Sequence, residues 1–83
     1  MDRIEIIERV NEFLAEDFEV DKSLITAEAN LRETLDLDSL DYVDLVVVIE
    51  SNFGFKVQPG DFQDIAKFED LYNYIETKYR EKQ

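Results

Sequence analysis

Residues 38–53 have the sequence DSLDYVDLVVVIESNF, whose apolar side chains recur at the spacing of an α-helix. At about 100° per residue, one side of this helix collects a core-facing stripe, formed by Tyr42, Leu45, Val46, Ile49 and Phe53. A second side collects Leu40, Val43 and Val47, beside Asp44. The pattern therefore predicts a helix with two apolar faces, and so small a protein has little with which to cover both.

The residues at the two ends of this segment predict where the helix begins and ends. Asp38 or Ser39 can cap its start, because both side chains accept hydrogen bonds from free backbone amides. Gly54 follows Phe53 and suits a left-handed C-terminal cap, with Phe55 as its apolar contact. We therefore expect a helix from residue 38 or 39 to about residue 53.

Helical spacing also governs the other parts of the chain. We expect a first helix over about residues 3–16, capped by Asp2 with Glu5 three residues later. Beyond the break at Pro59 and Gly60, Asp61 can cap a short third helix. The apolar spacing from residue 68 onward predicts the last helix. The last two helices could equally form one kinked segment, because Lys67 is a poor cap.

The connection over about residues 17–37 is too long to be structureless in a small domain. Asn30 with Glu33 predicts one short helical turn inside it. Leaving its apolar side chains in water would cost roughly 1.5–3 kcal/mol each, so we expect them to pin the connection to the core. They are Phe18, Val20, Leu24, Ile25, Leu31, Leu35 and Leu37.

Together these elements predict an all-α fold, a small four-helix bundle in a single domain over residues 1–83. It should have three main helices, one short helix and a long ordered loop between helices one and two. The length, the initial methionine and the charged end favour a free-standing protein.

Composition excludes several functions. The chain has no histidine and no cysteine, which removes the commonest acid–base group, thiol nucleophiles and zinc clusters, so we expect no enzyme, no catalytic residue and no resident metal. A formal net charge of −12 repels nucleic acids and anionic membranes and favours basic protein partners. No run approaches the length of a membrane span, and with no cysteine and no export signal a cytoplasmic location is expected. We also expect a monomer.

Ser39 has two interpretations. A serine at a helix start is usually a cap, but Asp38 can do the same, and the Ser39 hydroxyl would then be free. Helix N-termini favour anions, so this position suits a modification that carries a phosphate. No histidine or lysine close in sequence activates the hydroxyl, which indicates an acceptor modified by another enzyme.

The second apolar face also has two interpretations. An aliphatic strip flanked by carboxylates has the composition of a docking surface. Alternatively, Leu40 and Val43 could pack under the long loop, leaving Val47 and Val48 as ordinary exposed valines.

The run Asp38-Ser39-Leu40-Asp41, followed by Val43-Asp44-Leu45, Ile49-Glu50 and Phe53, resembles the acyl carrier protein family. The resemblance implies that a phosphopantetheinyl transferase attaches 4′-phosphopantetheine to Ser39, with Asp38 positioning the serine. The arm would then carry acyl groups as thioesters to fatty-acid or polyketide biosynthesis enzymes with basic docking patches. Implied recognition residues are Leu40, Asp41, Val43, Asp44, Val47 and Glu50. Residues implied to line a space for the acyl chain are Val46, Ile49, Phe53 and Ile65.

The chain departs from the family pattern at three places. Asp36 stands where the family often has glycine, and Ser51 and Asn52 stand where fatty-acid members commonly keep acids. The region of the third helix is altered by Phe62 and by Phe55-Lys56. These differences favour a specialised carrier that serves a secondary pathway.

Three other functions stay open. The same arm could hold aminoacyl or peptidyl groups in a nonribosomal peptide-like pathway, or the chain could be a helical adaptor that is never modified. Clustered acids at Asp36, Asp38, Asp41 and Asp44 suggest calcium. An EF-hand, however, needs glycine at the sixth position of its loop, where this chain has Asp41, so only loose cation binding fits.

Overall fold

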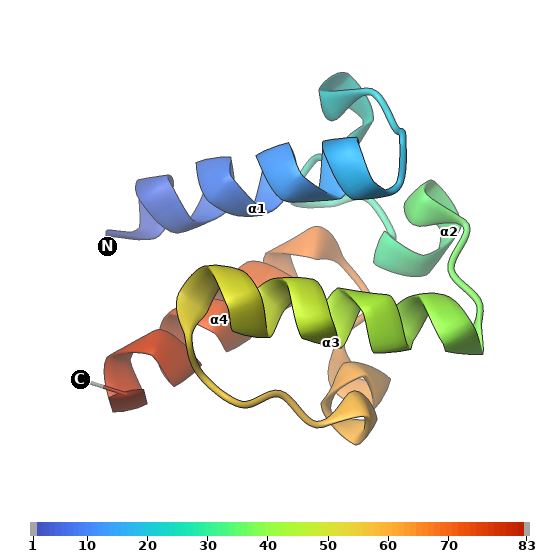
Figure 1. Cartoon of the computed structure of the whole chain (residues 1–83). Coiled ribbons are helices and arrows are strands. Elements are labelled where there is room, and N and C mark those ends of the chain that lie inside the picture. The colour runs from blue at the N-terminus through green and yellow to red at the C-terminus, as the bar shows by residue number, and fades with distance from the viewer. Residues whose placement is uncertain (1, 83) are drawn as a thin grey trace.

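A computed structural model describes residues 2–82, the side chains of Pro59 and Lys82 excepted (Figure 1). The long helices are α1 (Arg3–Asp17), α3 (Ser39–Phe53) and α4 (Phe68–Lys82). The short elements are η1 (Lys22–Leu24), α2 (Leu31–Leu35) and η2 (Pro59–Asp64). Within the described residues the only β-type pairing is an isolated bridge between Asn30 and Lys67. The predicted all-α fold with three main helices is therefore confirmed.

The helix α1 begins and packs as its sequence predicts. The Asp2 carboxylate accepts a hydrogen bond from the Glu5 amide at 2.9 Å. The buried face, which packs against α4, consists of Ile6, Val10, Phe13 and Leu14. The helix ends at Asp17, one residue beyond the expected end, where the Phe18 amide donates to the Leu14 carbonyl at 3.0 Å.

The long connection between α1 and α3 is pinned to the start of α4 by backbone hydrogen bonds. The Leu31 amide donates to the Ala66 carbonyl at 2.9 Å, and the Phe68 amide donates to the Ala29 carbonyl at 3.1 Å. The short turn predicted from Asn30 is present as α2, with the Asn30 side chain accepting from the Glu33 amide at 2.8 Å. This connection is therefore an ordered part of the fold.

Most apolar residues of the connection reach the core, as expected. The fully buried ones are Ile25, Leu31, Leu35 and Leu37. Phe18 and Val20 are half-buried against them. Leu24 is the exception, because its side chain is 56% exposed on η1. The expectation for Leu24 is wrong, since a single 3₁₀ turn that buries the neighbouring Ile25 leaves Leu24 facing solvent.

The segment before α4 differs from its prediction. The expected third helix is the 3₁₀ helix η2, which is capped by Gln58 without a side-chain hydrogen bond. Asp61 lies inside η2 and does not cap it; its Oδ2 accepts from the Tyr74 hydroxyl at 2.7 Å. Burial of the ring, together with this hydrogen bond, raises the pKa of Tyr74. Ile65 is extended, so η2 and α4 are separate helices and not one kinked segment.

The start of α4 depends on Asp70, because Lys67 is a poor cap. The Asp70 Oδ2 atom accepts hydrogen bonds from the Lys67 and Ala66 amides, both at 3.1 Å. The Glu69 amide donates to the Ala27 carbonyl at 3.0 Å. The hydrogen bonds from Lys67 and then Ala66 lower the pKa of the Asp70 carboxyl, because they stabilise its charged form.

We expect Asp70→Asn to lower the melting temperature near neutral pH, since a neutral amide oxygen accepts these hydrogen bonds more weakly. A lowered folded-state pKa stabilises the protein above the unfolded carboxyl pKa of about 3.9, and this contribution is lost as pH falls through the folded value. The difference in melting temperature between the wild type and Asp70→Asn should therefore become smaller below about pH 4. Glu69→Gln removes a charge from the same helical turn and is the control. A gap that stays constant with pH would contradict this role of Asp70.

Candidate functional site

The site begins with the cap of α3. The Asp38 Oδ1 atom accepts hydrogen bonds from the Leu40 amide at 2.9 Å and the Asp41 amide at 3.0 Å. In return, Asp41 Oδ2 accepts from the Asp38 amide at 3.1 Å, which completes a capping box. Of the two candidate caps, the structure therefore selects Asp38.

Ser39 is the first helical residue of α3 and is exposed. Among the hydrogen bonds formed by residues 2–82, none uses its hydroxyl, because Asp38 already satisfies the nearest amides. Figure 1 shows this end of α3 at the rim of the molecule, next to α2. The hydroxyl is therefore available to a modifying enzyme.

The turn that delivers Asp38 to this position depends on Asp36. Asp36 lies in the left-handed region, with φ 53° and ψ 53°, and caps the end of α2. Aspartate adopts this conformation more readily than most residues other than glycine, so the turn forms without the glycine common in the family. The next residue, Leu37, is buried and donates its amide to the Arg32 carbonyl at 3.0 Å. This anchor fixes the chain immediately before the cap.

The two apolar faces predicted for α3 are both present. Leu45, Ile49 and Phe53 are buried, with Tyr42 and Val46 half-buried beside them. On the other face, Leu40 is 75% exposed, Val43 53% and Val47 56%. Leu40 and Val43 therefore do not pack under the loop, and an aliphatic strip faces solvent.

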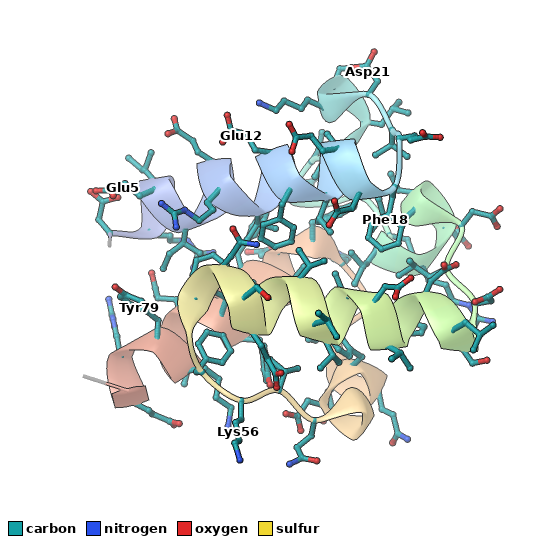
Figure 2. All side chains as sticks on the ribbon, in the orientation of Figure 1. Glu5, Glu12, Phe18, Asp21, Lys56 and Tyr79 are labelled. Atoms are coloured by element: carbon teal, nitrogen blue, oxygen red, sulfur yellow. The ribbon has the colours of Figure 1, made fainter. Side chains whose placement is uncertain are left out.

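A groove of about 320 Å³ borders this strip where α1 approaches α3. Its acidic wall is formed by Asp17, Asp41 and Asp44, and its apolar wall by Phe18, Val47 and Val48. Figure 2 shows the Phe18 ring between the two helices. Asp17 and Phe18 could not be assigned to this surface from the sequence, because only the folding of α1 against the bundle brings them to α3.

Glu50 differs from the other residues implied in recognition. Its side chain is half-buried, and Oε2 accepts a hydrogen bond from the Val57 amide at 2.9 Å. This bond joins α3 to the connection that leads to η2. One carboxylate oxygen of Glu50 is therefore engaged within the fold.

A larger cleft of about 900 Å³ opens beside Ser39, between α2, α3 and η2. Its lining includes the side chains of Arg32, Tyr42, Phe62 and Ile65. Of the four residues implied to line a space for an acyl chain, only Ile65 borders this cleft. Val46 is half-buried against the core, and Ile49 and Phe53 are fully buried within it.

These residues fit a covalently attached phosphate. The acceptor hydroxyl is exposed on the first turn of a fifteen-residue helix, where the partial positive charge of the helix favours an anion. Arg32 provides a cationic side chain in the adjoining cleft.

Within residues 2–82, no cluster of three or more acidic side chains is arranged to hold a metal ion, and no helix has the length and apolarity to span a membrane.

Comparisons with known proteins agree with this geometry. A family model described as "Phosphopantetheine attachment site" matches residues 5–75. An acyl carrier protein of Thermotoga maritima is 45% identical over 76 residues, covering 92% of this chain and 94% of the relative. An acyl carrier protein of Rubrobacter xylanophilus is 37% identical, covering 90% and 93%. The crystal structure of an acyl carrier protein from Thermotoga maritima superimposes with a TM-score of 0.80 at 28% identity, covering 100% of this chain and 96% of that one.

The division of tasks between Asp38 and Ser39 predicts different effects on stability. We expect Asp38→Ala to lower the free energy of unfolding by about 0.5–2 kcal/mol, because two α3 amides lose their acceptor. Ser39→Ala should change it by less than about 0.5 kcal/mol, because its hydroxyl bonds to no described residue. Urea denaturation measures both. A larger loss for Ser39→Ala would show that the serine is the cap.

Proposed function

Because the chain belongs to the acyl carrier protein family, we propose that Ser39 is the residue to which its 4′-phosphopantetheine arm is attached. The chain is a carrier of acyl groups through that arm. One observation carries the assignment of Ser39. Asp38 alone satisfies the amides at the start of α3, which leaves the exposed Ser39 hydroxyl without a role in the fold.

Attachment makes one bond and breaks one. The Ser39 Oγ atom loses its proton and bonds to the phosphorus that joins the pantetheine of coenzyme A to its nucleotide, and adenosine 3′,5′-diphosphate leaves. The chain has no histidine, and the neighbouring Asp38 carboxylate is held by two backbone amides, so we assign the base to the transferase. The thiol that holds the acyl group belongs to the arm, which explains a thioester carrier without cysteine. We propose that the chain itself catalyses nothing.

Partner enzymes meet a docking surface, which we define as Leu40, Asp41, Val43, Asp44 and Val47, with Asp17 and Phe18 at its border. The carboxylates attract basic patches during approach, and the aliphatic side chains supply apolar area once contact is made. The partners are the phosphopantetheinyl transferase and the enzymes that load and process the acyl group. Glu50 contributes its remaining oxygen at the edge of this surface.

The cargo that we propose is an acyl group of fatty-acid or polyketide biosynthesis. Ser51 and Asn52, which replace acids at the end of α3, favour a specialised pathway. The single domain, the monomeric state and the cytoplasmic location stay predictions.

The mass of the intact protein tests the attachment residue. After incubation with coenzyme A and a broad-specificity phosphopantetheinyl transferase, the wild type should gain the mass of one phosphopantetheine group. Ser39→Ala should gain none, because the acceptor oxygen is absent. Ser51→Ala removes an exposed serine from the other end of α3 and should be modified like the wild type.

Two outcomes would contradict this assignment. An unmodified wild type would favour a helical adaptor, and modification of Ser39→Ala would place the arm on another residue. Loading of the modified protein by an amino-acid-activating enzyme, but by no acyl-loading enzyme, would favour an aminoacyl carrier.

The docking surface predicts a matched pair of variants. Leu40→Ala removes an exposed leucine from the surface, and Leu24→Ala removes one that is exposed elsewhere. We expect Leu40→Ala to lower kcat/KM of the transferase by about tenfold, which corresponds to about 1.4 kcal/mol of lost contact. Leu24→Ala should leave kcat/KM within about twofold, since scattered surface residues carry little binding energy. Equal effects of the two variants would contradict the proposed surface.

A further inference from the structure

The space beneath α3 is filled by aromatic rings that touch one another in series. The series starts at the cleft beside Ser39, continues past η2 and α4 to Phe53, and branches there to Phe13 of α1 and Tyr79 of α4. Its members are Tyr42, Phe62, Tyr74, Phe55, Phe53, Phe13 and Tyr79. Neighbouring ring centroids lie 5.5–6.4 Å apart, within the range of direct aromatic contact.

The first pair of rings forms the inner wall of the cleft. Tyr42 and Phe62 both line it, with centroids 5.5 Å apart and ring planes inclined by 43°. Phe62 is buried and also contacts the Tyr74 ring at 6.4 Å. The Tyr74 hydroxyl is held by Asp61 at 2.7 Å, so the second layer of rings is anchored as well. Entry from the cleft into the interior therefore requires these rings to move.

Behind this wall the interior is closely packed. Leu45, Ile49 and Leu71 have no exposed surface, and Phe53 and Phe55 stack at 6.1 Å. Closely packed interiors accept extra methylene groups only by displacing side chains from preferred rotamers. An alkyl chain that entered here would have to displace rings that already contact each other.

We infer that the Tyr42–Phe62 pair keeps the acyl cargo out of the core, so that the arm and its cargo lie in the surface cleft beside Ser39. This inference rests on the proposed attachment at Ser39. On this inference Val46, Ile49 and Phe53 would not shelter an acyl chain, because contacting aromatic rings surround Phe53.

The cleft has side chains that suit the arm. Arg32 forms no ion pair with another described residue and, although the carboxylates of Glu33 and Asp36 line the same cleft, it can pair with the phosphodiester. Asn30 and Gln63 line the same cleft and can hydrogen-bond to the amides of the pantetheine chain. Tyr42, Phe62 and Ile65 supply apolar contact. Cargo held here stays reachable by enzymes, and short or polar acyl groups fit it better than long alkyl chains.

The test compares cargoes of increasing length on Ser39. The wild type is loaded by a broad-specificity transferase from acetyl-, hexanoyl- and decanoyl-coenzyme A, and intact mass confirms each product before melting. Cargo that entered the core would raise the melting temperature by up to roughly 3–6 °C for each buried methylene. We expect the melting temperatures of the three loaded forms to agree within about 2 °C, the range expected when no methylene is buried.

Amide chemical shifts give a second, independent measurement. In the decanoyl form, we expect changes from the phosphopantetheine-only form at Gln63 and Ala66, which line the cleft. The amides of Ile49 and Leu71 in the core should not shift. Shifts at Ile49 and Leu71, or a melting temperature that rises with cargo length, would overturn the inference.

A matched pair of variants tests the aromatic wall itself. Phe62→Ala opens the wall at the cleft, so its melting temperature should rise with cargo length. Phe55→Ala removes a ring of the same series away from the cleft, and its melting temperature should stay independent of cargo length. Phe62→Leu serves if Phe62→Ala does not fold. A length-independent melting temperature in both Phe62 variants would show that this ring is not the barrier.

The result also separates this inference from the proposed function. Absence of any mass increment on the wild type would overturn attachment at Ser39 and the inference with it. A loaded wild type whose melting temperature rises with cargo length would overturn the inference alone.

Discussion

The hydrogen bonds from the Leu40 and Asp41 amides to Asp38 fix the start of α3, and with it the geometry of the site. A helix leaves its first amides without partners, and a nearby side chain must satisfy them. Because the residue before Ser39 does so, the serine becomes the first helical residue with a hydroxyl that the fold does not need. Moving the cap by one residue would place the serine oxygen against the backbone.

The features that the sequence predicts correctly are those that neighbouring residues decide. The start of α3 follows from Asp38, and its end follows from Gly54, whose φ of 75° suits glycine. The two faces of α3 follow from the helical period alone. The site is therefore largely predictable, since Ser39 and the exposed strip occupy one helix and its cap.

The features that the sequence misses depend on distant partners. Asp61 has the chemistry of a cap, but Tyr74, thirteen residues later, takes its carboxylate as an acceptor. Asp17 and Phe18 reach the docking surface only because α1 ends near the middle of α3. A helical period says which side of α3 is buried, but it does not say that rings from η2 and α4 fill the space behind it.

The aromatic rings that fill the space behind α3 connect the stability of the fold to its function. A domain of this size buries a smaller share of its surface than a larger domain does, so large rings are an efficient way to build its core. A core of contacting rings is also one that cannot accommodate a second occupant without losing those contacts. We therefore propose that the protein separates its two apolar tasks in space. In this arrangement the inner face of α3 stabilises the fold, whereas cargo would lie in the cleft and partner enzymes would bind the exposed strip on the outside.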